Sequence, residues 1–344
     1  MIKNTEIYSS PMINENKQRL YCIDILKGIC SIFVIITHYN WQETERLKFL
    51  FPFWIDMAVP VFMIISGYLY AKSYKKKEIS NIGSAYLLEN ILNKIFRFTF
   101  PFTIIFLIEQ ILFYILTVEN WNNKNIWSFI YLFLRGGTGP GSYYYPVMIQ
   151  FIFVFPVIYF IIKKHDFKGL LLCGILNALF EILKCAYCMN EECYRLLMFR
   201  YLFVIAFGCY MEIRKTKLKN IWYFTSLIIG VLFIIIVCYT EYTPVIVIFW
   251  TRTSFISGLY IIPIMVILIN KINFRCKILE LFGKASFNIF LVQMVYFNFI
   301  EWIPYQINSR LGQILINIIV CVSLGSIFYY IEGNLGRKLF KNYK

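Results

Sequence analysis

Charged residues are scarce in this chain of 344 residues. Asp, Glu, Lys and Arg together make up 15% of the sequence, whereas 59% of the residues are hydrophobic. A soluble globular domain is about one quarter charged. This deficit excludes an ordinary soluble enzyme and predicts an all-α, polytopic integral membrane protein.

Long polar connections are also missing. The longest stretches between apolar runs are about 71–95 and 118–142, and the sequence shows no internal repeat or low-complexity linker. No loop can hold a soluble domain, so any chemistry must take place within a helical bundle or at its mouths. We expect a tail at 1–20, a transmembrane domain at 21–331 and a second tail at 332–344.

We expect no cleavable signal peptide before the first apolar run. The first twenty residues are polar, and the first apolar run is too long and too charged for the apolar region of such a peptide. We expect that run to act as an uncleaved signal anchor.

Apolar runs of about 20 residues, the length that a spanning helix needs, recur through the chain. The run 126–134 is too short to span and predicts an interfacial or re-entrant segment. We expect about ten transmembrane helices, at 21–40, 51–71, 96–117, 143–162, 169–188, 196–213, 221–240, 245–269, 285–303 and 312–331.

The basic residues predict the orientation in the membrane. Of the 34 Lys and Arg residues, 24 fall on the side of the two termini and 8 on the other side. Basic residues accumulate in cytoplasmic loops, so both termini should be cytoplasmic, with Trp41–Leu50 and Glu119–Gly141 outside. The net charge of +15 therefore indicates a lipid bilayer as partner, not nucleic acid. The richness in Lys, Ile, Asn and Phe indicates an AT-rich bacterial genome, and we expect a multi-pass protein of the bacterial plasma membrane.

Histidine is the rarest chemically useful residue, with only two in the chain. His38 lies in the first apolar run together with Asp24 and Lys27. At about 100° per residue, the spacings of eleven and fourteen residues place all three on one stripe, with Lys27 and His38 about 16 Å apart. Ionisable groups inside a span are functional candidates. The alternative is an Asp24–Lys27 pair at the membrane surface and a histidine that is merely buried.

Metal chemistry has little support. Ten cysteines are scattered, and the densest group is Cys185, Cys188 and Cys193, a single C-x-x-C without a second pair. Small buried thiols are the better interpretation. We expect no metal and no bound cofactor.

Other polar groups lie inside or beside apolar runs. Glu109 falls in mid-span, where a charge must be protonated or paired, and Glu181 and Lys184 are spaced to pair with each other. Asn288 and Gln293 need partners inside the bundle. Each of the other candidates also has an ordinary structural explanation. Lys94 and Arg97 could meet phosphate or merely snorkel to the membrane surface. Ser66 and Gly67 could admit a ligand or merely pack against another helix, and Tyr143 and Tyr144 could stack on carbohydrate or belong to an aromatic belt.

The ordered set of these motifs resembles the membrane acyltransferase family three. Lys27 and His38 match a basic residue, ten residues and a histidine in the family's first helix. PVFMIISGYL, NKIFRFTFP, GSYYYPVMIQFIFVFPVIYF and FGKASFNIFLVQ then resemble, in order, its Ser-Gly-aromatic motif, its basic third-helix start, an aromatic helix entry and a late helix. The resemblance covers roughly 20–331.

The resemblance implies an O-acetyltransferase that uses cytosolic acetyl-CoA as cosubstrate. The acceptor would be a sugar hydroxyl of an envelope or capsular polysaccharide, or of its lipid-linked precursor. His38 would be the general base or a transient acyl carrier, with Asp24 also assigned to the catalytic set. Lys27, Lys94 and Arg97 would bind the donor, and Ser66, Gly67, Tyr143, Tyr144 and Gln293 would line the pore or bind the acceptor.

Two departures from the family pattern weaken individual assignments. Lysine stands at position 27 where the family usually has arginine, which keeps the charge but removes bidentate phosphate recognition. Gln293 stands about where the late helix often has a histidine. Two other classes remain open: a transporter that moves a glycan without chemistry, and a polysaccharide polymerase, although polymerases of that kind usually have a large outer loop. The oligomeric state is not readable from the sequence.

Overall fold

The computed structural model describes residues 11–116, 125–214, 220–240, 255–271, 274–302 and 309–339. Every regular element in these ranges is a helix, which confirms the all-α fold. Parts of the tails 1–20 and 332–344, of the loops 118–142 and 214–219 and of the expected spans 245–269 and 285–303 lie outside the described residues.

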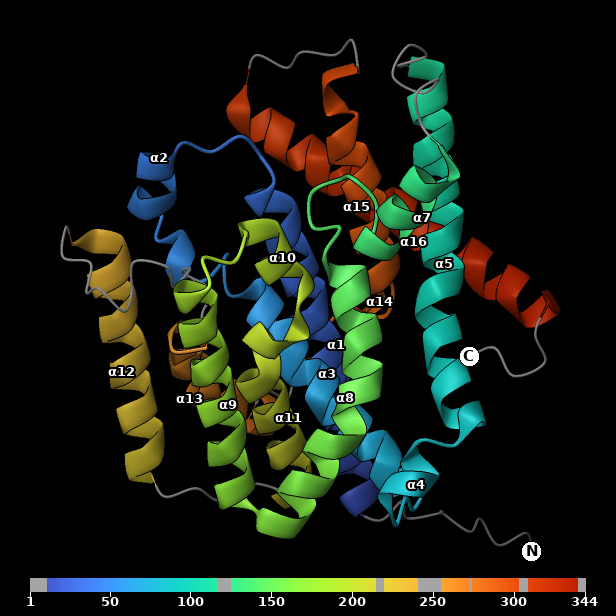
Figure 1. The fold of residues 1–344 in the computed structure, drawn as a ribbon. Helices are drawn as coiled ribbons and strands as arrows, with labels where there is room; N and C mark the ends of the chain where they lie inside the picture. The colour runs from blue at the N-terminus through green and yellow to red at the C-terminus, as the bar shows by residue number, and fades with distance from the viewer. Residues whose placement is uncertain are drawn as a thin grey trace, which may run out of the picture.

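Helices follow one another with short connections (Figure 1). In chain order they are α1 (Pro11–Thr37), α2 (Glu43–Lys48), η1 (Phe51–Phe53), α3 (Ala58–Lys76), α4 (Ile82–Ala85), α5 (Leu88–Leu116), α7 (Ile126–Arg135), α8 (Tyr144–His165), α9 (Phe167–Ala186), α10 (Glu191–Leu196), η2 (Met198–Tyr201), α11 (Leu202–Arg214), α12 (Asn220–Tyr239), η3 (Ser257–Tyr260), α13 (Ile261–Lys271), α14 (Lys277–Lys284), α15 (Ser286–Asn298), η4 (Ile300–Trp302) and α16 (Arg310–Leu339).

Six helical stretches in the described residues are long and apolar enough to cross a membrane. They contain α3, α5, α8, α9, α12 and α16 and overlap six of the expected spans. The pair α14 and α15, bent by 71°, raises the number to seven if it forms one span. With the family membership reported below, these helices make the chain a multi-pass membrane protein. The total of about ten spans stays a prediction.

The expected short segment at 126–134 is the helix α7. The Asn125 side chain accepts a hydrogen bond from the Ser128 N–H at its start, and Gly136 ends it with φ of 96°. With 10 residues it is about 15 Å long, too short to span a bilayer. The structure therefore agrees with the interpretation of this segment as non-spanning.

The interior of the bundle is built on α3, α8 and α11. Their buried rings include Tyr74, Phe151, Phe155 and Phe207. Helices α3 and α11 cross at Gly67 and Gly208, where an added Cβ would lie 2.1 Å and 1.9 Å from backbone oxygens of the facing helix. Such contact of backbone on backbone fixes the crossing of these two helices.

Apolar side chains are exposed on the outer helices. Figure 1 shows α12 at one edge of the bundle and α5 at the opposite edge. Leu232 on α12 is 52% exposed and Ile111 on α5 is 57% exposed, as large apolar residues are on a face that meets lipid. Helix α1, which carries the charged stripe, instead lies inside, where it contacts α3, α13, α14, α15 and α16.

An ion pair joins the connection after α1 to the start of α16. Both carboxylate oxygens of Glu45 accept hydrogen bonds from the Arg310 guanidinium, the Oε2 bond at 2.7 Å. The Arg310 side chain and the Gln42 backbone N–H lower the pKa of Glu45 from 4.5 to about 2. The fork-on-fork geometry is the strong form of such a pair.

This pair predicts a pH-dependent contribution to stability. Because the folded-state pKa of Glu45 is depressed, its contribution is complete above about pH 4.5 and is lost as the pH falls toward 2. In detergent, the difference in unfolding temperature between the wild type and Glu45→Gln should shrink from pH 6 to pH 3. Glu89→Gln, at an exposed carboxylate on α5, should show no such change; a constant Glu45→Gln difference would contradict the assignment.

Candidate active site

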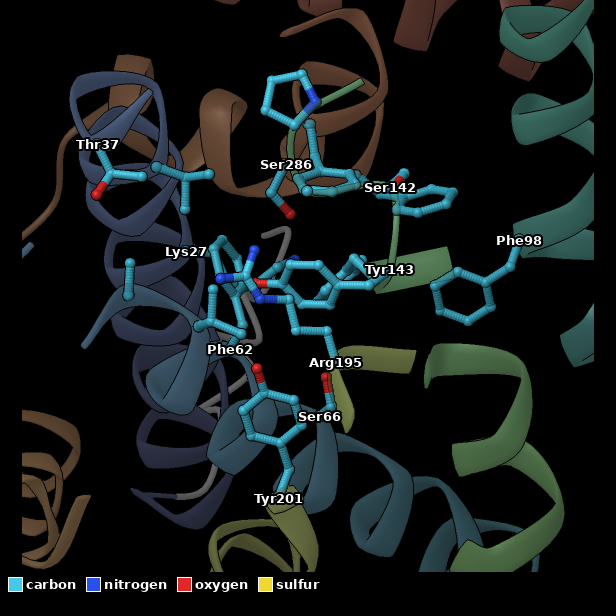
Figure 2. A pocket seen from close by; sticks show the side chains of 18 of the residues that line it. Lys27, Thr37, Phe62, Ser66, Phe98, Ser142, Tyr143, Arg195, Tyr201 and Ser286 are labelled. Carbon is cyan, nitrogen blue, oxygen red and sulfur yellow. The ribbon is translucent and has the colours of Figure 1, made fainter. Parts of the chain in front are cut away.

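A cavity of about 1660 Å³ runs through the interior of the bundle. Its wall is formed by α1, α3, α5, α8, α14 and α15, by the loop 136–143 and by residues of α9, α10 and η2. Figure 2 shows part of the lining, with Ser66 and Phe62 from α3, Tyr143 from the loop and Arg195 from α10 around one space. Of the predicted site residues, the cavity is lined by Asp24, Lys27, His38, Ser66, Lys94, Arg97, Tyr143 and Tyr144.

One end of the cavity, here called the cationic end, is lined by Lys27, Lys94, Arg97 and Lys284. Lys27 Nζ lies 3.6 Å from the Asp24 carboxylate. Lys94 Nζ lies 3.2 Å from the Tyr74 hydroxyl and 4.6 Å from the centre of the Tyr70 ring. Within the described residues no ion pair joins Arg97 or Lys284 to an acid, which leaves a surplus of positive charge at this end.

Lys284 was not a predicted site residue, and its position follows from a helix contact. Gly28 on α1 and Gly283 on α14 face each other so closely that a Cβ on Gly283 would lie 1.8 Å from the Asp24 carbonyl oxygen. This contact brings Lys284 near enough to Asp24 and Lys27 to act on both electrostatically. The sequence signal for Lys284 was its place after Gly283 in the motif FGKASFNIFLVQ. The count of basic residues on each side of the membrane treats Lys284 only as an ordinary loop cation.

Asp24 lies with Lys27 and not with His38. Fourteen residues separate Asp24 from His38, which is about 21 Å along a continuous helix. Asp24 therefore does not contact His38, and its assignment to the catalytic set stays a prediction. Its observed role is to partner Lys27 at the cationic end.

The opposite end, here called the histidine end, begins at His38, the first residue after α1. The His38 ring packs on Phe297 with centroids 5.9 Å apart and lines the cavity. Next to it, Arg46 forms an ion pair with Asp56, and Thr37 Oγ1 donates a hydrogen bond of 3.4 Å to the same carboxylate. Asp56 was missed, although an acid inside an apolar run is itself a signal of function.

The loop 136–142 forms the wall that faces His38. Gly136, Gly137 and Gly141 have φ of 96°, 95° and 87°, a conformation that residues with a Cβ rarely adopt. An added Cβ on Gly141 would lie 3.8 Å from His38 Nε2 and 2.9 Å from the Phe290 ring. Glycine is therefore required at position 141 by its positive φ and by the Phe290 ring, and it places this backbone next to His38.

Glu109, expected to need a partner in mid-span, holds this loop in place. Its fully buried carboxylate accepts a hydrogen bond of 2.9 Å from the Thr138 hydroxyl and one of 3.3 Å from Asn298 Nδ2. The Thr138 backbone N–H donates to the same oxygen at 3.3 Å. The paired buried acid therefore connects α5, the loop and α15.

Several predicted positions have other surroundings. Gly67 lies in the crossing of α3 and α11, and Gln293 is 1% exposed; neither lines the cavity. The Gln293 amide and Asn288 Nδ2 have no hydrogen-bond partner in the described part of the chain, contrary to expectation, although Asn288 lines the cavity. Glu181 accepts hydrogen bonds from Tyr194, and the ion pair of Lys184 is with Glu191. No group of three or more potential metal ligands occurs among the described residues.

The sequence model of a family described as "Acyltransferase domain", acyltransferase family three, matches residues 20–331. The chain belongs to this family. It is a membrane acyltransferase, and the matched range contains every residue of the cavity lining except Glu332. Comparison with curated proteins and with solved structures found no match.

Proposed function

We propose that this membrane acyltransferase transfers an acetyl group from cytosolic acetyl-CoA to a sugar hydroxyl of an envelope or capsular polysaccharide, or of its lipid-linked precursor. The observation that carries the proposal is the single cavity with a surplus of cations at one end and His38 at the other. The distribution of basic residues assigns the cationic end to the cytoplasm, where acetyl-CoA is made.

The cationic end suits the polyanionic part of the donor. Acetyl-CoA carries several phosphate charges, and Lys27, Lys94, Arg97 and Lys284 offer ammonium and guanidinium donors to them. The pantetheine arm would then extend along the cavity and bring the thioester toward His38. The chain binds, orients and encloses the donor, and no resident cofactor takes part.

At the histidine end, His38 acts as the general base. Its imidazole takes the proton of the sugar hydroxyl while that oxygen attacks the thioester carbonyl carbon, forming the C–O bond. The carbon–sulfur bond breaks, and the coenzyme A thiolate takes up a proton as it leaves.

Replacement of His38 tests this mechanism. In membranes supplied with labelled acetyl-CoA, His38→Ala and His38→Gln should each lower acetyl transfer at least about 100-fold, because glutamine keeps a hydrogen bond but accepts no proton at neutral pH. His165→Ala, at the end of α8 and outside the cavity lining, should transfer normally. Near-normal transfer by His38→Gln at normal protein level would make His38 structural. Glycan flux without any acetyl transfer in the wild type would instead support a transporter.

A second prediction concerns the donor end. Lys284→Ala and Lys27→Ala should each raise the KM for acetyl-CoA about tenfold with little change in kcat, because a hydrogen bond to a charged group is lost in ground and transition states alike. Lys27→Arg should retain most of the affinity. Lys277→Ala, on the same helix α14 but outside the lining, is the matched control. An unchanged KM for Lys284→Ala would remove this residue from the donor site.

A further inference from the structure

We propose that the acceptor sugar carries a negative charge, as a carboxylate or a phosphate, and that Arg195 at the histidine end binds this charge beside the ring of Tyr143. The inference rests on the proposed function and names the chemical class of its acceptor. It comes from the charges, rings and backbone geometry of the wall opposite α1.

The first observation is a local surplus of positive charge. Glu191 is shared by two cations: its carboxylate lies 3.2 Å from Lys184 Nζ and 3.2 Å from Arg195 Nε. The neighbouring Arg135 and Glu192 balance each other at 3.0 Å. The cations that line this part of the wall are Arg135, Lys184, Arg195 and Arg200, and the acids beside them are Glu191, Glu192 and Glu181, so four cations face three acids.

The second observation concerns the atoms that Arg195 presents. Arg195 Nε donates a hydrogen bond of 3.2 Å to the Glu191 carboxylate, and Figure 2 shows the side chain reaching from α10 into the cavity beside Tyr143. A guanidinium has two edges that can each bind an oxyanion with two parallel hydrogen bonds. Glu191 contacts Arg195 through Nε, and the guanidinium also has an edge formed by its two terminal nitrogens, on a side chain that lines the cavity. A neutral hydroxyl uses that fork poorly, whereas a carboxylate or phosphate fits it.

The third observation is a rigid aromatic surface next to this fork. Arg200 is 5% exposed, and its guanidinium lies 4.7 Å from the Tyr194 ring, 4.8 Å from the Tyr201 ring and 6.0 Å from the Tyr143 ring. These cation–π contacts hold Tyr143 in position at the cavity wall. The apolar face of a sugar ring can lie on such a ring while its charged substituent extends to Arg195.

The geometry also relates this surface to the reacting atoms. Tyr143 is two residues beyond Gly141, whose backbone faces His38 Nε2. Figure 2 shows Arg195 beside Tyr143, and His38 lines the same cavity next to Gly141, so a sugar on Tyr143 lies between residues that contact His38 and Arg195. One hydroxyl can meet the general base while the negative charge is bound by arginine, which fixes which hydroxyl is acetylated.

Competition between matched sugars tests the inference. In the acetyl-transfer assay with native membrane acceptor, methyl glucuronide and methyl glucoside 6-phosphate should inhibit at about tenfold lower concentration than neutral methyl glucoside. The more potent of the two charged sugars identifies carboxylate or phosphate as the recognised group. Equal inhibition by all three sugars, or inhibition by none, would overturn the proposal while leaving acetyl transfer itself established.

Variants connect that preference to Arg195. Arg195→Gln should abolish the preference for charged sugars while the KM for acetyl-CoA stays unchanged, and Arg195→Lys should keep part of it, because the charge remains without the fork. Lys48→Gln, an exposed cation on α2 outside the cavity lining, should keep it in full. A preference that survives Arg195→Gln would assign the residue to a structural pair with Glu191.

Direct binding separates this inference from the proposed function. If wild-type membranes transfer no acetyl group at all, the proposed function fails, yet equilibrium dialysis of labelled methyl glucuronide against the purified protein still measures the site. Binding that is about tenfold weaker in Arg195→Gln supports the anion site, and equal binding in both proteins contradicts it.

Discussion

The structure depends on the close contact between α1 and α14 at Gly28 and Gly283. A charged stripe in an apolar bundle is stable only if it faces a partner or a polar cavity. The glycine contact removes the side chains that would hold the two helices apart, so Asp24, Lys27 and Lys284 gather at the cationic end of the cavity. Because α1 continues without a break to Thr37, the same helix sets His38 at the far end of the cavity.

The two ends of the cavity differ in how their charges are balanced. At the cationic end Arg97 and Lys284 join Lys27 and Lys94 with few acids nearby, which favours a polyanion that enters and leaves. At the histidine end most cations have a fixed carboxylate partner, as in Arg46–Asp56 and Arg135–Glu192. Cations in such fixed ion pairs form part of the cavity wall. Because Glu191 is shared by Lys184 and Arg195, one positive charge in this part of the wall remains for binding an anionic acceptor. The buried Glu109 then holds the glycine loop against His38.

Much of this arrangement could be predicted from the sequence because helical periodicity acts within one element. The stripe of Asp24, Lys27 and His38, the non-spanning helix α7 and the cations Lys94 and Arg97 all follow from spacing and hydropathy along single segments. Contacts between segments could not be predicted in this way. Lys284 reaches the cationic end through a glycine crossing between α1 and α14, which the spacing within either segment does not reveal. Gly67 lies in a helix crossing and Gln293 lies outside the cavity lining. Neither position could be predicted, because the identity of a small or polar residue does not reveal which neighbour it contacts.

The central claim is that one cavity receives acetyl-CoA from the cytoplasmic side and delivers the acetyl group to an acceptor at the other end. Sealed membrane vesicles of both orientations, supplied externally with labelled acetyl-CoA, test it most directly. Inverted vesicles, with the cytoplasmic face outward, should label their glycan, and right-side-out vesicles should do so only after the membrane is opened. Labelling of sealed right-side-out vesicles would place the donor site on the outer face and contradict this account.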